Sequence, residues 1–170
     1  MERIRILATG GTFDKEYNEL TGELFFKGTH IAAMLRLGRS RVEVEIETVM
    51  MIDSLQMTEA DRALILKRCV EAPERRIVIT HGTDTMEQTA AALGVGEGVE
   101  LKTIVMTGAM VPYTFGSSDG LFNLGTALGF VQTLGPGVYV AMNGRCFPWT
   151  EVTKDRARGV FESVPGLRGE

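Results

Sequence analysis

The chain has 170 residues, of which 44% are apolar, and a formal net charge of −4. This length fits one domain with a sizeable core. The excess of acidic residues argues against a nucleic-acid partner, because non-specific binding to phosphates relies on clustered Lys and Arg. We therefore expect a small-molecule substrate.

Two cysteines, Cys69 and Cys146, lie far apart and in no CxxC or Cys/His spacing. We expect two reduced thiols and no metal site. The N-terminus, MERIRIL, lacks the apolar run of a signal peptide, and no stretch approaches the length of a membrane span. The expected compartment is the cytoplasm, without a membrane partner.

Apolar runs and glycine turns predict an alternation of strands and helices along the chain. The run RIRILAT predicts a buried strand that ends at Gly10 and Gly11. The alternating run VEVEIETVM predicts a strand with one solvent-exposed face, nearer an edge of the sheet. The expected elements, in chain order, are a strand at 3–9, a mobile flap or hairpin at 14–28, a helix at 30–37, a strand at 42–50, a helix at 58–71, a strand at 76–80, a helix at 84–93, a strand at 102–108, a helix at 121–133, a strand at 138–143 and a tail with weak strand signals.

Short buried strands that alternate with helices predict a single-domain, three-layer α/β/α fold with a mainly parallel sheet, of the Rossmann or flavodoxin-like kind. Ligands of such folds bind at the loops beyond the carboxyl ends of the strands. Three of these loops carry hydroxyls, and in two of them an acid stands beside the hydroxyl: the loops hold Thr12, Asp53 with Ser54, and Thr83 with Asp84.

Several common chemistries do not fit these loops. TGGTFDKEY matches neither GxGxxG nor GxxxxGK[ST], so a phosphate cradle is disfavoured. A Ser/His/Asp arrangement would need an available histidine, and we expect His81, at a strand end among small residues, to be a packed core residue. A threonine nucleophile needs some base within reach, and a lysine can serve if it is made neutral. Composition alone does not select that lysine.

Five motifs together resemble those of the bacterial-type L-asparaginases. They are TGGT at 9–12, HGTDTMEQTA at 81–90, TGAMVP at 107–112, SDGLFNL at 118–124 and the MN(x)8VTK run that ends at Lys154. The resemblance extends over residues 7–163 and implies the fold of the asparaginase N-terminal domain. It also implies an amidohydrolase that converts L-asparagine to L-aspartate and ammonia without a metal or organic cofactor.

By this resemblance Thr12 is the nucleophile, and Thr83, Asp84 and Lys154 form a second catalytic group in which lysine and aspartate polarise the threonine hydroxyl. Tyr17 matches the tyrosine that assists from a flexible loop, although it lies nearer to TGGT than is usual in the family. The histidines are then not needed for the reaction.

The resemblance also implies a set of substrate contacts. Asp84 would hold the α-ammonium, Ser54 the α-carboxylate and the carbonyl of Ala109 the side-chain amide. Backbone N–H groups near the two threonines could form an oxyanion hole. Ser54 as a plain loop residue and Asp84 as a helix N-cap, with Glu87 three residues on, remain open alternatives.

The sequence departs from the family in two further ways. The family continues into a second domain, for which the 170 residues leave no room, so we expect a homodimer or higher homo-oligomer in which another copy closes each pocket. DRAR replaces a hydroxyl-rich run after Lys154. Asp119 and Asn123 are expected to be structural.

Two other functions remain open: a non-catalytic module that binds asparagine or aspartate, and an amidotransferase subunit that passes ammonia to a partner. Activity on glutamine is open as well, since one methylene changes discrimination by only about 1–3 kcal/mol.

Overall fold

The structure is a computed structural model that describes residues 2–164. Its centre is a six-stranded sheet, and the expected α/β fold with a mainly parallel sheet is confirmed. Five strands run parallel, and the last pairs antiparallel with its neighbour. In spatial order the strands are β4 (Val44–Ile52), β1 (Ile4–Gly10), β5 (Arg76–Thr80), β6 (Thr103–Thr107), β7 (Gly137–Met142) and β8 (Arg145–Pro148).

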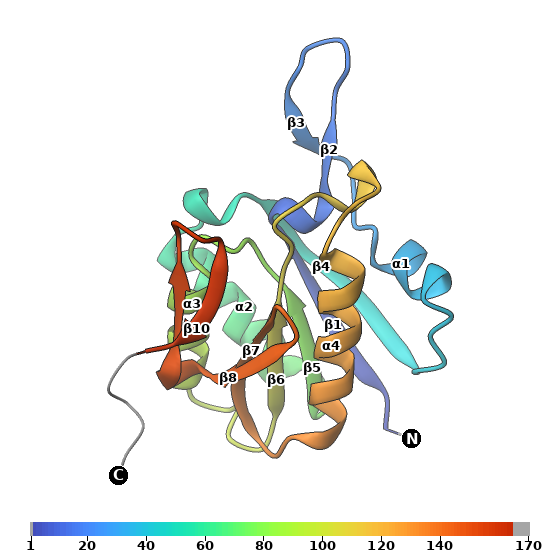
Figure 1. The fold of residues 1–170 in the computed structure, drawn as a ribbon. Coiled ribbons are helices and arrows are strands. Elements are labelled where there is room, and N and C mark those ends of the chain that lie inside the picture. The colour runs from blue at the N-terminus through green and yellow to red at the C-terminus, as the bar shows by residue number, and fades with distance from the viewer. Residues whose placement is uncertain (1, 165–170) are drawn as a thin grey trace.

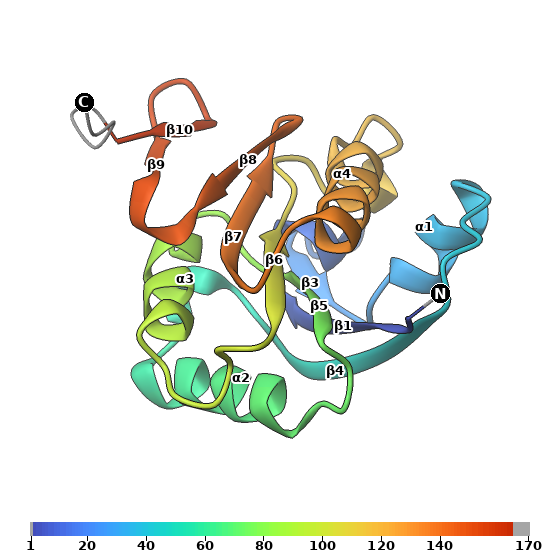
Figure 2. The ribbon, with the colours of Figure 1, turned by 90° about the horizontal axis from the view of Figure 1, so that it is seen from below.

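Helices cover both faces of this sheet, which gives the three layers seen in Figures 1 and 2. One apolar core lies beneath α2 (Glu59–Glu71) and α3 (Met86–Gly94), and the other beneath α1 (Ile31–Leu37) and α4 (Gly120–Thr133). The central strands β1, β5 and β6 are buried nearly throughout, which explains their continuous apolar runs. Strand β4 is at an edge, as its alternating pattern predicts.

Local signals account for the positions of several helix ends. At the start of α2, the Thr58 hydroxyl accepts a hydrogen bond from the Asp61 N–H, and the Asp61 carboxylate accepts one from the Thr58 N–H. This reciprocal capping is the reason for the sharp beginning of the helix. Helix α3 begins at Met86, two residues later than expected, with Thr85 at the N-cap position.

The expected flap is a hairpin of β2 (Lys15–Tyr17) and β3 (Leu24–Phe26) that projects from the carboxyl edge of the sheet (Figure 1). It is preceded by a short 3-10 helix at Thr12–Asp14, where a plain loop was expected. The base of the hairpin is fixed by the buried Asp14, whose Oδ1 accepts hydrogen bonds from the His30 N–H (2.8 Å) and the Thr29 hydroxyl (3.2 Å).

The tail forms regular strands, although its residues carry only weak strand signals. A second hairpin, β9 (Val152–Asp155) and β10 (Val160–Ser163), packs beside α3 (Figure 2). Val152 and Phe161 are buried in the core under α3, and the Asn143 side chain accepts a hydrogen bond from the Phe161 N–H (3.1 Å). The hairpin is therefore anchored to the body of the domain by both apolar and polar contacts.

Candidate active site

The loops at the carboxyl ends of β1, β4 and β5 are packed so tightly that their glycines cannot carry side chains. A Cβ at Gly82 would lie 2.5 Å from Ser54 Oγ, and a Cβ at Gly11 would overlap the backbone of Gly82 itself. The neighbours of these glycines, Thr12 and Thr83, are thereby brought to the same edge of the sheet. This is the meeting of loops that the parallel fold predicts.

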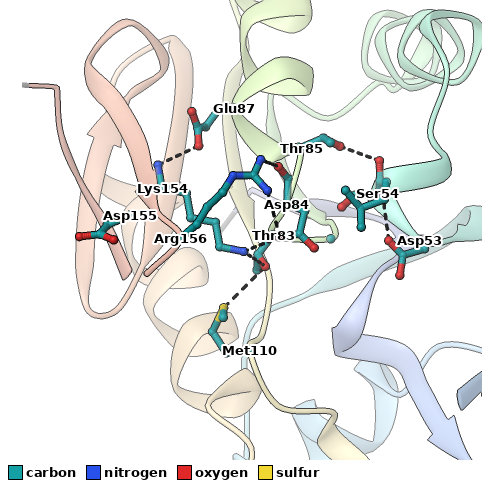
Figure 3. Close-up of polar contacts among 12 residues, drawn as sticks. Asp53, Ser54, Thr83, Asp84, Thr85, Glu87, Met110, Lys154, Asp155 and Arg156 are labelled. Carbon is teal, nitrogen blue, oxygen red and sulfur yellow. Dashed lines mark hydrogen bonds and ion pairs between the residues drawn. The ribbon is translucent and has the colours of Figure 1, made fainter. Parts of the chain in front are cut away.

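A lysine–threonine–aspartate cluster forms the most specific polar arrangement at this edge (Figure 3). Lys154 Nζ donates hydrogen bonds to Thr83 Oγ1 and to Asp84 Oδ1, both at 2.8 Å. The lysine side chain is only 5% exposed, whereas that of Asp84 is 38% exposed. A nearly buried ammonium is thus paired with one carboxylate and one hydroxyl.

Strand β9 is held against α3 by a second contact of the same lysine. The backbone N–H of Lys154 donates to Glu87 Oε1 (2.7 Å). Glu87 therefore positions β9 and does not form the N-terminal box with Asp84 that was an open alternative. Asp84 is not the N-cap of α3, because that position belongs to Thr85.

The loop after β4 is joined to the loop after β5. The Thr85 hydroxyl donates to the backbone oxygen of Ser54 (2.8 Å), and Ser54 is buried in a short 3-10 helix, Ser54–Gln56. Asp53 forms an ion pair with Lys15 at the base of the flap. Partial burial raises the pKa of Asp53, but the hydrogen bonds from Lys15 and from the Leu55 N–H outweigh it and hold that pKa below its usual range.

The loop after β6 completes the edge. Ala109 is buried, and Met110 Sδ lies 3.6 Å from Thr83 Oγ1. The Asp119 carboxylate accepts hydrogen bonds from the Met110 and Val111 N–H groups, and Asn123 donates to Asp119 and to the Gly108 carbonyl. The structural role expected of Asp119 and Asn123 is confirmed.

Two of the predicted site residues, Thr12 and Tyr17, do not take part in the polar contacts described above. Thr12 is half-buried and follows Gly11, which packs against Gly82, and Tyr17 is 53% exposed on the flap, where it lines a shallow groove with Thr114 and Phe115. Among residues 2–164 neither side chain makes a hydrogen bond. The structure therefore joins Thr83, Asp84 and Lys154 directly and links Ser54 to the same loop through Thr85, whereas the side chains of Thr12 and Tyr17 make no such contact among residues 2–164.

His81 is a core residue, as expected. It is fully buried, with Nδ1 2.7 Å from the Gly82 carbonyl and Nε2 2.8 Å from the Thr89 hydroxyl. Burial lowers the pKa of its imidazole from 6.5 to about 4. A histidine that is neutral and enclosed in this way is not available as a base for Thr12.

Arg156 was not among the site residues predicted from the sequence. Its Nη2 donates to the Asp84 carbonyl (2.9 Å), and its Nη1 lies 3.8 Å from Asp84 Oδ1 (Figure 3). One signal could have identified it: Arg156 lies two residues after Lys154, and in an extended chain residues i and i+2 point to the same side.

Within residues 2–164, no group of three His, Cys, Asp or Glu side chains is close enough to hold a metal ion, and no helix there has the length and apolar character needed to cross a membrane. Both cysteines are free, and burial raises the pKa of Cys69 to about 12 and that of Cys146 to about 11.

Fold and site together define a three-layer α/β protein with a polar site at the carboxyl edge of a parallel sheet. The family model "Asparaginase, N-terminal" matches residues 3–165, and the chain belongs to this family.

Three relatives illustrate the match. The L-asparaginase of Thermococcus kodakarensis is 31% identical over 167 residues, which is 95% of this chain and 51% of that protein. Its solved structure superposes with a TM-score of 0.84. L-asparaginase 2 of Escherichia coli is 34% identical over 96% of this chain and 50% of its own length. A glutamyl-tRNA(Gln) amidotransferase component of Pyrobaculum aerophilum is 33% identical over 75% of this chain and 31% of its own length. The chain thus spans about half the length of the first two relatives.

Proposed function

We propose that this chain is an amidohydrolase that splits the side-chain amide of L-asparagine into L-aspartate and ammonia. The observation that carries this proposal is the nearly buried Lys154 ammonium, hydrogen-bonded to both Thr83 and Asp84. Such a cluster can move a proton at a hydroxyl. The relatives named L-asparaginase support this choice of substrate.

In the proposed reaction Thr12 attacks the amide carbon, and ammonia leaves from the tetrahedral intermediate. Water then completes the hydrolysis with help from the second group. The 2.8 Å contact places Lys154 Nζ where it can exchange a proton with the Thr83 hydroxyl, while Asp84 orients the lysine. Backbone N–H groups of the loops at Gly11 and Gly82 are suited to stabilise the oxyanion, because they are fixed before the reaction begins.

Substrate contacts in this proposal come from the loops after β4, β5 and β6. Asp84 receives the α-ammonium, Ser54 the α-carboxylate and the Ala109 carbonyl the side-chain amide. Tyr17 assists Thr12, and its exposed position on the flap means that the hairpin must close over the substrate first. Because the site is open to solvent beside Asp84, we further propose that a second copy of the chain covers it.

The test is ammonia release from L-asparagine and from L-glutamine by the intact chain. Thr12→Ala and Lys154→Met should each reduce kcat by a factor on the order of 100 or more. Thr133→Ala and Lys67→Met are matched controls, because both residues are exposed, lie on helices away from the site and pair only locally. Activity that persists in Thr12→Ala would contradict the nucleophile, and aspartate binding without any ammonia release would favour a binding module.

A second candidate is an amidotransferase component that supplies ammonia to a partner, which the similarity to the amidotransferase of Pyrobaculum aerophilum favours. It predicts weak ammonia release by the isolated chain and a stable hetero-complex. Pull-down from the native host, followed by activity measurement with and without the recovered partner, separates this candidate from the free amidohydrolase.

A further inference from the structure

One residue at the base of the flap contacts two of the loops that form the candidate site. Lys15 follows Thr12 in the loop after β1 and begins strand β2. Its side chain forms an ion pair with Asp53 in the loop after β4. Its carbonyl accepts a hydrogen bond from the Thr114 hydroxyl (3.1 Å) in the loop after β6. Lys15 therefore links the loop of the proposed nucleophile to two neighbouring loops.

The backbone joins the loops after β1 and β4 only where these loops begin. The parallel pairing of the two strands becomes irregular there, because one residue of β1 lies opposite three of β4, residues 49–51. The Gly11 N–H then donates a hydrogen bond to the Ile52 carbonyl (2.9 Å). Within the described part of the chain no backbone hydrogen bond joins the two loops past this contact, and the Lys15–Asp53 pair is the polar contact that does so.

The same ion pair controls the charge next to Ser54. Asp53 directly precedes Ser54 (Figure 3), and its side chain is 29% exposed, so water screens its charge only in part. Burial raises the pKa of Asp53, but hydrogen bonds from Lys15 and from the Leu55 N–H hold that pKa below its usual range, so the carboxylate is ionised at pH 7. Among residues 2–164 its ion-pair partner is Lys15 alone. Without this lysine, a partly buried negative charge would stand unpaired beside Ser54.

We propose that Lys15 is a positioning residue that neutralises Asp53 and thereby keeps the loop of Ser54 able to bind a substrate carboxylate. This inference rests on the proposed function, which assigns the α-carboxylate to Ser54, and it adds a residue to that site. Two carboxylates at close range in a partly buried site repel each other, whereas a neutralised pair removes this repulsion. Lys15 thus acts on the substrate through Asp53.

The experiment compares the native chain with Lys15→Met, Asp53→Asn and the double variant. Calorimetry measures the Kd of L-aspartate, the proposed product, and ammonia release measures KM and kcat on L-asparagine. We expect Lys15→Met to weaken aspartate binding about tenfold and to raise KM by a similar factor, with kcat changed less than about threefold. Asp53→Asn and the double variant lack the negative charge, so both should bind aspartate within about threefold of the native chain.

Recovery of affinity in the double variant separates this role from two others. If the pair were only a mechanical link between the loops, all three variants would lose affinity to the same extent. If the lysine contacted the substrate directly, the double variant would bind aspartate as weakly as Lys15→Met does. Lys15→Arg keeps the positive charge and should bind aspartate nearly as well as the native chain.

The exposed pair of Lys67 and Glu71 on α2, with Nζ 3.8 Å from Oε1, is the matched control. Lys67→Met, Glu71→Gln and their combination should leave Kd, KM and kcat unchanged, because this pair is exposed and lies on a helix away from the site. Circular dichroism verifies that each variant is folded.

The inference and the proposed function fail in different ways. No ammonia from the native chain with asparagine would refute the proposed hydrolysis, while the aspartate affinities would still decide the role of Lys15. Native aspartate affinity in Lys15→Met, or a double variant as weak as Lys15→Met, would overturn the inference even if the chain hydrolyses asparagine rapidly. A native chain that binds no aspartate would overturn it as well.

Discussion

The contact between Gly11 and Gly82 should be essential, because it is what brings the two threonine loops together. Gly11 has φ of 74°, in the region that favours glycine, and an added Cβ would overlap both Cα and N of Gly82. Placing Ala at such a φ costs about 1–2 kcal/mol, and forcing an extra carbon into packed backbone costs about 1–3 kcal/mol more. Gly11→Ala should therefore reduce the free energy of unfolding by about 2–5 kcal/mol, a large part of the ~5–15 kcal/mol typical of a domain.

Urea denaturation followed by circular dichroism measures this loss, and ammonia release measures its effect on the site. With a slope of about 1–3 kcal/mol per molar urea, the midpoint should fall by roughly 1–2 M. Because a displacement of about 1 Å can reduce a rate ~100-fold, kcat should fall more steeply than stability alone explains. Gly28→Ala is the control: no heavy atom lies within 4 Å of its added Cβ, and its φ is not positive, so it should be neutral or slightly stabilising. A native urea midpoint in Gly11→Ala would refute the packing argument.

Three other predictions concern titratable groups. Removing the flap pair by Lys15→Met should lower the free energy of unfolding by about 0.5–1 kcal/mol at pH 7. Because the pKa of Asp53 is below its usual range, this contribution is present above about pH 4 and is lost as the pH falls through the lowered folded value, so native and variant urea midpoints should converge at low pH. For His81, whose pKa falls from 6.5 to about 4 on burial, the unfolded chain binds a proton that the folded chain does not, so stability should decrease by roughly 3 kcal/mol as pH falls across that window. The free energy of unfolding of His81→Gln, measured by urea denaturation at each pH, should not show this decrease. An identical decrease in the variant would contradict its assignment to His81. Cys69 and Cys146, with pKa values raised to about 12 and about 11, should react with a thiol reagent at pH 8 only after unfolding, and rapid labelling of the native chain would contradict their inertness.

The start of helix α3 could not be predicted correctly from the local sequence. The residues from Asp84 onward carry a good capping pattern, and the sequence favours a helix that begins there. In the structure Asp84 bonds to Lys154 and Arg156, Glu87 bonds to the backbone of β9, and the helix begins at Met86. The two acids that a local pattern assigns to a helix end are used by a hairpin far along the chain.

The strands of the C-terminal hairpin also could not be predicted from the local sequence. Residues 152–163 have little strand character of their own, and they become a hairpin because Val152 and Phe161 enter the core beside α3 and because Asn143 and Glu87 bond to their backbone. The order of elements, their burial and the loop chemistry elsewhere could be predicted, since continuous apolar runs and glycine turns are properties of neighbouring residues.

The sequence by itself determined the alternation of buried strands and helices, and with it the edge of the sheet at which Thr12, Ser54 and Thr83 would meet. The family resemblance already pointed to Lys154, but only the tertiary structure shows that its ammonium reaches Thr83 and Asp84 and that Arg156 reaches Asp84 as well. Lys154 is separated from Thr83 by 71 residues and Arg156 from Asp84 by 72. Contacts at that separation depend on packing of the whole domain, which no local pattern of residues encodes.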